Sequence, residues 1–317
     1  MKRHILMLGP LPRPQMLALQ EKYQVHLLWK VEDPELLLQE VKDDVTAVVA
    51  TAWNKVSEKL INALEKLEII ANFGVGFDNI DIEAARMRGI PVTNTPDVLT
   101  DDVADFAMGL ILAVNRRLVE GDIYARSGRW AENGMLPLGR SLGGKTMGIL
   151  GFGRIGRAIA ERALPFGLRI IYSGPHKKEN VVYDYYADLA SMAAEADFLM
   201  VSCVSNEQTY HLVDKAVLQA LGVEGVVINI SRGHVIDEAS LVQALVEGDL
   251  RGAGLDVFEK EPYIPEALRS MDNVVLQPHQ ASATVETREA MGQLVVDNLN
   301  CYFDHAELLT PVLKSKI

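Results

Sequence analysis

The sequence predicts an α/β protein made of two units, each a doubly wound parallel sheet with helices on both faces. Short apolar runs alternate with amphipathic stretches in both halves of the chain, as in strands joined by crossover helices. A glycine pattern, G-x-G-x-x-G, separates an apolar run from a helical stretch near the middle. The length of 317 residues allows about two domains at roughly 150 residues each.

Composition narrows the classes of protein and partner. With 49% hydrophobic and 23% charged residues the chain is typical of a folded globular protein. The net charge of −12 argues against nucleic acid and anionic membranes as partners. Cys203 and Cys301 form neither a disulfide framework nor a metal pattern, so we expect free buried thiols, no metal and a cytoplasmic location. Gly9-Pro10 ends the first apolar run too early for a signal peptide, and no run approaches the ~20 residues of a membrane span.

The first 98 residues predict one α/β unit. Its strands are expected at His4–Leu8, Val25–Trp29, Ala47–Ala50 and Leu67–Asn72, and its helices at Pro12–Lys22, Pro34–Lys42 and Ser57–Leu64. The loop Phe73–Asp78 follows the fourth strand and contains two glycines. Such a loop can aim backbone N–H groups at an anion, but on the loop alone a plain tight turn is the favoured interpretation.

A long helix predicts the boundary between the units near residue 98. Thr100 is a good N-cap, and apolar residues then recur at steps of three and four as far as Val114. The stretch Val119–Leu142 is less regular and carries apolar residues among glycines and charges. We expect this arm to form a subunit interface, with burial against its own chain as the alternative.

The glycine pattern predicts a dinucleotide site. A strand over Met147–Leu150 is followed by Gly151, Gly153 and Gly156, and a helix is expected over 157–164. In such a turn the first glycine bends the chain, the second admits a pyrophosphate, and the third lets the helix approach the strand. The helix N-terminus offers unpaired N–H groups to phosphate. The spacing alone is weak, since many glycine turns bind nothing, but its place between strand and helix favours a nucleotide.

The loop after the next strand, Leu168–Tyr172, bears on the choice of cofactor. In NAD-binding units a carboxylate here holds the ribose 2′-hydroxyl, and none appears before Glu179. The predicted contacts to the 2′ position are Ser173, Gly174, Pro175, His176 and Lys177, with Lys178 beside them. Potential donors without a carboxylate favour NADP(H), with NAD(H) as the alternative and a merely solvated loop as the non-functional interpretation.

Four further strands complete the second unit. They are expected at Phe198–Val204, Val226–Ile230, Gly252–Val257 and Val274–Leu276. A helix is expected at Glu238–Glu247, a last helix begins at Thr284, and Leu308–Val312 closes the chain. Cys203 and Val204, at the end of the first of these strands, are expected beside an adenine ring.

Three ionisable residues follow the last strands of this unit: Arg232, Glu261 and His279. Singly they are a surface arginine, a charged turn and a loop histidine. Jointly, at one sheet edge beside a dinucleotide loop, they predict an active site for reducing a 2-oxo acid. Arg232 would hold the carboxylate with two bonds and stabilise charge on the keto oxygen. His279 would supply the proton, and Glu261 would orient its ring and favour the protonated form.

These motifs together resemble the D-isomer-specific 2-hydroxyacid dehydrogenases. The resemblance rests on Gly151-Phe-Gly-Arg-Ile-Gly156, Asn229-Ile-Ser-Arg-Gly233, Gly254-Leu-Asp-Val-Phe-Glu-Lys-Glu-Pro262, Pro278-His279, Phe73-Gly-Val-Gly-Phe-Asp-Asn-Ile-Asp81 and Val92-Thr-Asn-Thr-Pro-Asp-Val-Leu-Thr-Asp-Asp-Val-Ala-Asp105. Within the family, the chain is similar to NADPH-dependent glyoxylate/hydroxypyruvate reductases and to plant hydroxyphenylpyruvate reductases. The likeness covers nearly the whole chain.

The resemblance implies a Rossmann cofactor domain, residues 99–283, inserted in a flavodoxin-like substrate domain, residues 1–98 and 284–317. It also implies a homodimer and a cleft that closes on the substrate. By matching position, Arg232 holds the substrate, Glu261 pairs with His279, and His279 is the acid/base. Val75 and Gly76 would offer backbone N–H groups to the substrate carboxylate. The positions implied along the cofactor are Phe152, Gly153, Arg154 and Ile155 at the pyrophosphate and Ile230 and Asp256 at the nicotinamide.

Two departures from the family pattern limit these expectations. Gly174 stands where NADP-using relatives often carry arginine, so Lys177 or Lys178 would have to compensate. Pro278-His-Gln-Ala-Ser282 replaces the common Pro-His-Ile-Gly-Ser, which changes the wall beside the histidine. The expected activity is NADPH-dependent reduction of glyoxylate or hydroxypyruvate to the D-2-hydroxy acid. The alternatives are reduction of hydroxyphenylpyruvate or another bulky 2-oxo acid, and a dinucleotide-sensing binding protein of the corepressor type.

Overall fold

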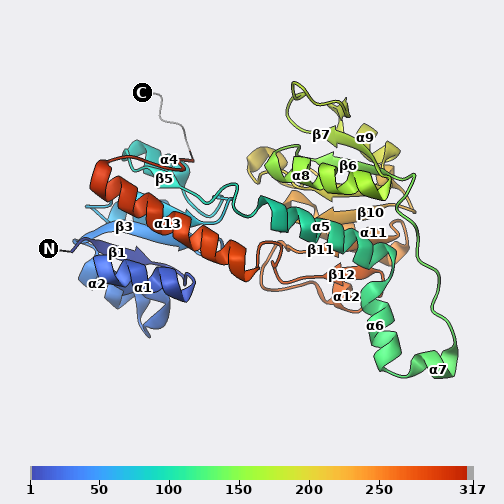
Figure 1. The fold of residues 1–317 in the computed structure, drawn as a ribbon, viewed down its shortest axis with the longest axis horizontal. Coiled ribbons are helices and arrows are strands. Elements are labelled where there is room, and N and C mark those ends of the chain that lie inside the picture. The colour runs from blue at the N-terminus through green and yellow to red at the C-terminus, as the bar shows by residue number, and fades with distance from the viewer. Residues whose placement is uncertain (1, 313–317) are drawn as a thin grey trace. The chain divides into compact units, whose positions relative to one another are not determined.

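The computed structural model describes residues 2–312 and divides the chain into two compact units. One unit is Met1–Leu99 with Ala283–Ile317, and the other is Thr100–Ser282 (Figure 1). Each unit contains a parallel sheet, of five and seven strands respectively, with helices between the strands. The predicted fold class is confirmed.

The first unit has the strand order β2-β1-β3-β4-β5. The strands are β1 His4–Met7, β2 Gln24–Leu27, β3 Val45–Thr51, β4 Ile69–Phe73 and β5 Val92–Thr93. The helices are α1 Arg13–Lys22, α2 Pro34–Val41, α3 Glu58–Ala63, α4 Ile82–Met87 and α13 Val285–His305. This order, 2-1-3-4-5, is that of flavodoxin-like sheets. The central strands are apolar runs that are buried along most of their length, as a sheet covered on both faces requires.

Helix α13 returns the end of the chain to this first unit. Thr284 caps the helix, because its side chain accepts a hydrogen bond from the Thr287 amide at 3.1 Å. The hydroxyl of Tyr23, just after α1, donates to Asn300 at 2.8 Å. Thr310 donates to the Asn94 carbonyl at 2.6 Å, which ties the segment after α13 to the end of β5. The first sheet is therefore completed by residues from near both chain ends.

The second unit has the strand order β12-β11-β10-β9-β6-β7-β8. The strands are β6 Thr146–Leu150, β7 Arg169–Ser173, β8 Asp184–Tyr186, β9 Phe198–Val201, β10 Val226–Asn229, β11 Gly252–Leu255 and β12 Val274–Leu276. Numbered from β6, the order contains the 3-2-1-4-5-6 arrangement of the Rossmann fold. The strand order reverses between the parallel neighbours β6 and β9, which is the switch point where such sheets bind ligands.

Helices join the strands of the second unit. They are α5 Thr100–Asn115, α6 Leu118–Arg126, α7 Arg129–Asn133, α8 Arg154–Ala163, α9 Leu189–Glu195, α10 Lys215–Leu221, α11 Glu238–Glu247 and α12 Glu266–Arg269. Short 3₁₀ turns occupy Leu28–Lys30, Leu164–Phe166, Glu207–Thr209 and Gly233–Val235. The buried face of α5 packs against α8 and the strands β10–β12, and Arg162 of α8 bonds Asp101 and Asp105 of α5 at 2.9 and 2.5 Å.

The arm after α5 is more regular than predicted. It forms two short helices, α6 and α7, that extend away from the sheet of their own unit (Figure 1). Its apolar side chains face outward: Trp130 is 65% exposed, Met135 82% and Leu138 89%. Burial of these side chains against their own chain, the alternative from the sequence, is therefore wrong. The helices were missed because their apolar residues do not line a core-facing stripe.

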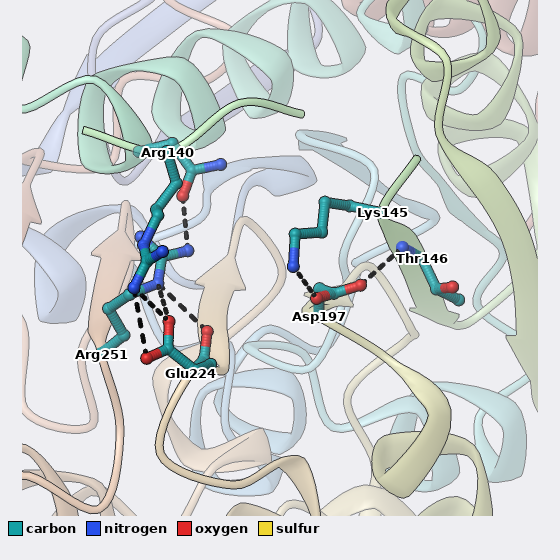
Figure 2. A network of polar contacts seen from close by, with 7 residues as sticks. Arg140, Lys145, Thr146, Asp197, Glu224 and Arg251 are labelled. Atoms are coloured by element: carbon teal, nitrogen blue, oxygen red, sulfur yellow. Dashed lines mark hydrogen bonds and ion pairs between the residues drawn. The ribbon is translucent and has the colours of Figure 1, made fainter. Parts of the chain in front are cut away.

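Where the arm rejoins the sheet, it is anchored by polar contacts at the amino ends of the strands (Figure 2). The guanidinium of Arg140, on the returning arm, forms an ion pair with the Glu224 carboxylate at 3.2 Å. Arg251 donates to the Asn115 side chain at 2.6 Å and to the Glu224 carbonyl at 3.1 Å. Beside this group, the carboxylate of Asp197 accepts two hydrogen bonds. One comes from the Lys145 ammonium at 2.7 Å and the other from the Thr146 amide at 2.8 Å. These contacts fix the start of β6.

Some predicted element bounds differ from the structure. Helix α8 begins at Arg154 instead of Arg157, because the extended backbone of Gly153 already serves as its N-cap. Strand β9 ends at Val201, so Cys203 and Val204 lie on a loop. Thr100 is the first residue of α5 instead of its cap. Helix α4 and the short edge strand β8 were not predicted from the sequence.

Candidate active site

The three glycines of the turn after β6 differ in the space around them. Protein atoms crowd Gly151 and Gly156, whereas the space beside Gly153 is open. Gly151 has a φ of +92°, and a Cβ there would overlap the backbone of Cys203. A Cβ on Gly156 would overlap the carbonyl of Gly151. At Gly153, by contrast, no described atom lies within 4 Å of the place a Cβ would take. Gly153 also lies directly before the N-terminus of α8, so the turn fits the pyrophosphate of a dinucleotide.

The neighbouring loop after β9 closes one side of this turn. Ser202 donates its hydroxyl to the Gly151 carbonyl at 2.9 Å, and Cys203 lies against Gly151. Both cysteines are free and partly exposed, instead of fully buried as expected. Burial still raises the pKa of the Cys203 thiol to about 11, so the thiol is neutral at physiological pH. Val204 is 69% exposed, which leaves it able to contact an adenine ring.

The side chain of Phe152 points into the core. Its ring packs against Tyr172, with 4.7 Å between centroids, and the residue is only 4% exposed. Any contact of Phe152 with pyrophosphate would therefore come from its backbone. Arg154 is exposed and Ile155 partly exposed at the start of α8.

The loop after β7 is shaped by tyrosines. Tyr185 donates its hydroxyl to the Gly174 carbonyl at 3.0 Å, and Tyr172 accepts the Lys178 amide at 2.9 Å. The Lys178 ammonium lies 3.1 Å from His176 Nε2. Pro175, His176 and Lys177 are exposed, whereas Ser173 is buried. The loop thus presents cationic groups at the carboxyl end of β7.

Glu261 and His279 are brought together, as predicted. His279 Nδ1 lies 2.8 Å from Glu261 Oε2, and the other carboxylate oxygen accepts the Phe258 amide at 3.1 Å. Both side chains are about four-fifths buried, at 21% and 19% exposure. Because a carboxylate only accepts hydrogen bonds, Nδ1 carries the proton in this pair. Nε2 is then the ring nitrogen that would exchange a proton with a substrate.

The backbone around His279 is held by Asp256. His279 has a φ of +57°, a conformation that few non-glycine residues adopt. Asp256 accepts the Gln280 amide at 2.6 Å and the Ala281 amide at 2.9 Å through its carboxylate, and its carbonyl accepts the His279 amide at 2.9 Å. Burial raises the pKa of Asp256 above its ordinary value, although the two amides act in the opposite direction. Asp256 thus orients the histidine loop, a role that its motif in the sequence did not indicate.

Arg232 lies on the loop after β10, the strand next to β11. The buried Asn229 organises this loop: its side chain donates to the Arg232 carbonyl at 2.9 Å and accepts the Ser231 amide at 3.0 Å. The guanidinium of Arg232 donates to the Ser231 carbonyl at 2.9 Å. A Cβ on Gly233 would overlap the backbone of Phe258, so the arginine loop packs directly on the loop that carries Glu261. Ile230, which lies between Asn229 and Ser231 in the sequence, is buried.

The predicted substrate amides lie in the first unit, on the loop after β4. Asn72 is fully buried and donates to the Gly76 carbonyl at 2.8 Å, while Asn94 donates to the Val75 carbonyl at 2.9 Å. Side chains therefore organise this glycine loop, which sequence reasoning had favoured as a plain turn. The contacts of Val75 and Gly76 with substrate stay predictions.

A family model decides the affiliation of the chain. The model described as D-isomer specific 2-hydroxyacid dehydrogenase, NAD binding domain, matches residues 108–281. The chain belongs to this family. It is 47% identical to a glyoxylate/hydroxypyruvate reductase A of Arabidopsis thaliana, over 98% of both chains. It is 46% identical to a hydroxyphenylpyruvate reductase of Plectranthus scutellarioides, again over 98% of both chains.

A solved structure of the family agrees in fold. The NADPH-dependent glyoxylate/hydroxypyruvate reductase of Sinorhizobium meliloti, in complex with NADP and malonate, superposes with a TM-score of 0.91 at 43% identity. The match covers 98% of this chain and 97% of that one. Over residues 2–312 of this 2-hydroxyacid dehydrogenase, no helix is long and apolar enough to cross a membrane.

Proposed function

We propose that this 2-hydroxyacid dehydrogenase uses NADPH to reduce a small 2-oxo acid, glyoxylate or hydroxypyruvate, to the D-2-hydroxy acid. The observation that carries the proposal is the Glu261–His279 pair. It sits at the carboxyl edge of the sheet that bears the open glycine turn, on a loop packed against the arginine loop. The names of the relatives support the same reaction class.

Each of the three ionisable residues has a separate task in this reaction. Arg232 binds the substrate carboxylate through its planar guanidinium and stabilises negative charge on the keto oxygen. NADPH, when bound, supplies the hydride that the carbonyl carbon accepts. His279 Nε2 donates a proton to the keto oxygen, and Glu261 stabilises the imidazolium form before that transfer. Val75 and Gly76 bind the substrate carboxylate through their amides.

The cofactor is held by the second unit. Gly153, Arg154 and Ile155 bind the pyrophosphate with the N-terminus of α8, and Cys203 and Val204 line the adenine. Gly174 stands where NADP-using relatives often carry an arginine. Lys177 and Lys178 take over the contact with the 2′-phosphate, which favours NADPH over NADH. Ile230 and Asp256 flank the nicotinamide. The NADP-bound relative supports this cofactor choice.

A bulky 2-oxo acid such as hydroxyphenylpyruvate is the second candidate substrate. Two observations favour keeping it: the 46% identity to the hydroxyphenylpyruvate reductase, and the replacement of the common Ile-Gly by Gln280-Ala281 beside His279. The second change alters the wall of the pocket where a substrate side chain would lie. A dinucleotide-sensing binding protein is the candidate from another functional class.

The domain roles and the assembly complete the proposal. Residues 1–98 and 284–317 bind the substrate, and residues 99–283 bind the cofactor. The enzyme is a cytoplasmic homodimer in which the exposed apolar side chains of the arm, Trp130, Met135 and Leu138 among them, meet the partner. Light scattering of the purified protein measures this oligomeric state directly.

The deciding experiment is a steady-state assay at 340 nm that crosses NADPH and NADH with glyoxylate, hydroxypyruvate and hydroxyphenylpyruvate. We expect rapid NADPH oxidation with the two small acids. Turnover with hydroxyphenylpyruvate alone would move the assignment to the bulky substrate. Cofactor binding without turnover of any acid would contradict a reductase and support the binding protein.

A further inference from the structure

The loop after β11 carries two glutamates, and each of them is paired with a histidine. Glu261 binds His279 at 2.8 Å, as described above. Two residues earlier, Glu259 Oε1 lies 2.6 Å from His211 Nε2. His211 comes from the loop after β9, 48 residues away in sequence. The second pair has no part in the reaction proposed above, so its purpose needs an explanation.

Glu259 is anchored by several hydrogen bonds to neighbouring elements. Its amide donates to Glu238 Oε2 at 3.2 Å, and its own Oε1 accepts the Glu238 amide at 3.3 Å. The backbone of His211 is fixed in turn, because its amide donates to the His234 carbonyl at 2.8 Å. The ring of Tyr210 stacks on that of His211, with 4.0 Å between centroids. Glu259 is thus tied to the loop after β9 and to the N-terminus of α11.

Several charged side chains surround the contact between Glu259 and His211. His211 faces Glu259 directly and also interacts with Asp237. Glu238 interacts electrostatically with both Glu259 and Lys260. Burial raises the pKa of Glu238 above its ordinary value. The side chains of Glu259 and His211 are 22% and 32% exposed, so water competes weakly for their hydrogen bond.

We propose that Glu259 and His211 are positioning residues: they hold the loop so that Glu261 stays in register with His279. Only Lys260 separates the two glutamates, so a displacement of Glu259 is passed along the backbone to Glu261. A shift of about 1 Å is enough to break a 2.8 Å hydrogen bond and to misplace a proton donor. The inference rests on the proposed role of His279 as the acid.

The test compares Glu259→Ala with Glu259→Gln, because glutamine keeps an oxygen that accepts from His211. For Glu259→Ala we expect kcat with glyoxylate to fall about 10-fold to 100-fold. KM for glyoxylate and the Kd for NADPH, from cofactor fluorescence, stay within about 2-fold. Glu259→Gln restores kcat to within about 3-fold of the wild type. A purely structural role would lower Tm in Glu259→Ala without this split between kcat and KM.

A second readout does not depend on activity. The His279 Nδ1–H proton, held by Glu261, gives a downfield ¹H NMR signal that is assigned by its loss in His279→Ala. We expect Glu259→Ala to broaden this signal through faster exchange with water, and Glu259→Gln to retain it. An unchanged signal with wild-type kcat in Glu259→Ala overturns the inference. If Glu259→Ala does not fold, His211→Ala removes the same contact from the other side and is judged by the same criteria.

The failure of this inference differs from the failure of the proposed function. If His279→Ala keeps wild-type turnover, the acid has been assigned wrongly. If His279→Ala loses turnover while Glu259→Ala and His211→Ala both keep it, the acid stands and the positioning role falls.

Discussion

The seven-stranded sheet carries charged side chains at both ends of its strands, and the two edges use them differently. At the carboxyl edge, Glu261 and His279 come from loops and pair with each other at four-fifths burial. At the amino edge, Glu224 and Arg140 pair at more than half exposure, and their neighbour Arg251 also bonds backbone (Figure 2). In sequence both groups are scattered charges near strand ends.

The difference lies in what each group is built to contact. The amino-edge charges join the arm to the sheet, and Gly139 packs so closely on the Asn115 carbonyl that a Cβ would stand 2.6 Å away. The carboxyl edge includes the open position at Gly153 and a histidine held in a rare backbone conformation. Such features also occur near the amino edge, where Arg117 has a φ of +53° and no described atom lies within 4 Å of a Cβ on Gly144. Pairing at four-fifths burial is what separates Glu261 and His279 from the exposed charges of the amino edge.

The largest effect that this contrast predicts is at His279. In His279→Ala we expect kcat to fall about 10²-fold to 10⁴-fold, because the proton donor is lost, while the Kd for NADPH is unchanged. Arg232→Ala should damage both kcat and KM, since it removes charge stabilisation and substrate binding together. The matched control is His305→Ala, at the exposed end of α13. Wild-type turnover in both active-site variants would show that the carboxyl edge is not the catalytic edge.

A smaller effect separates the two cofactors at the carboxyl end of β7. The double variant Lys177→Ala/Lys178→Ala should raise KM for NADPH about 10-fold, because charge-assisted bonds to a 2′-phosphate are lost. KM for NADH should change less than about 2-fold. The control is Lys59→Ala/Lys66→Ala, which removes two exposed lysines of the first unit. Equal effects on NADPH and NADH would make the pair ordinary surface lysines.

The smallest effect is expected at the amino edge. Glu224→Ala should cost less than about 1 kcal/mol of unfolding free energy, because the ion pair with Arg140 is exposed to solvent. Asn115→Ala should cost more, about 1–3 kcal/mol, because it leaves the half-buried Arg251 without its 2.6 Å acceptor. Urea denaturation measures both, and kcat per folded enzyme should stay at the wild-type value. A loss of kcat in Glu224→Ala would show that the amino edge also serves catalysis.

Much of the fold could be predicted because short stretches of the sequence determine it. Most strands of both sheets are short apolar runs between turn residues, and the three glycines have fixed roles at a strand–helix turn. The arm helices and β8 were not predicted, because their residues are exposed or partly exposed in the single chain. Their apolar residues therefore recur with neither the helical nor the strand period that burial on one face produces. Element ends were shifted by a few residues where a cap, as at Gly153, overrides the apolar pattern.

The motifs of the candidate site could be predicted from the sequence, but the contacts that hold its residues in place could not. Arg232, Glu261 and His279 stand at strand ends, which the sequence reveals. The partner of Glu259 is 48 residues away on another loop, and no local spacing indicates that contact. The carboxylate of Asp256 is used by amides whose positions depend on the turn at His279. Such contacts arise only when loops from neighbouring strands are brought to one edge.

The return of α13 to the first unit has a consequence for synthesis of the chain. Strands β1–β5 leave the ribosome first, but Asn300, which binds Tyr23, and Thr310, which binds Asn94, are made after the whole of Thr100–Ser282. At roughly 5–20 residues per second, those intervening residues, about 180 of them, take about 10–40 s to synthesise. During that interval the first sheet lacks its last helix, while the inserted unit can already complete its own core. The second unit is therefore expected to mature first, although it is translated later.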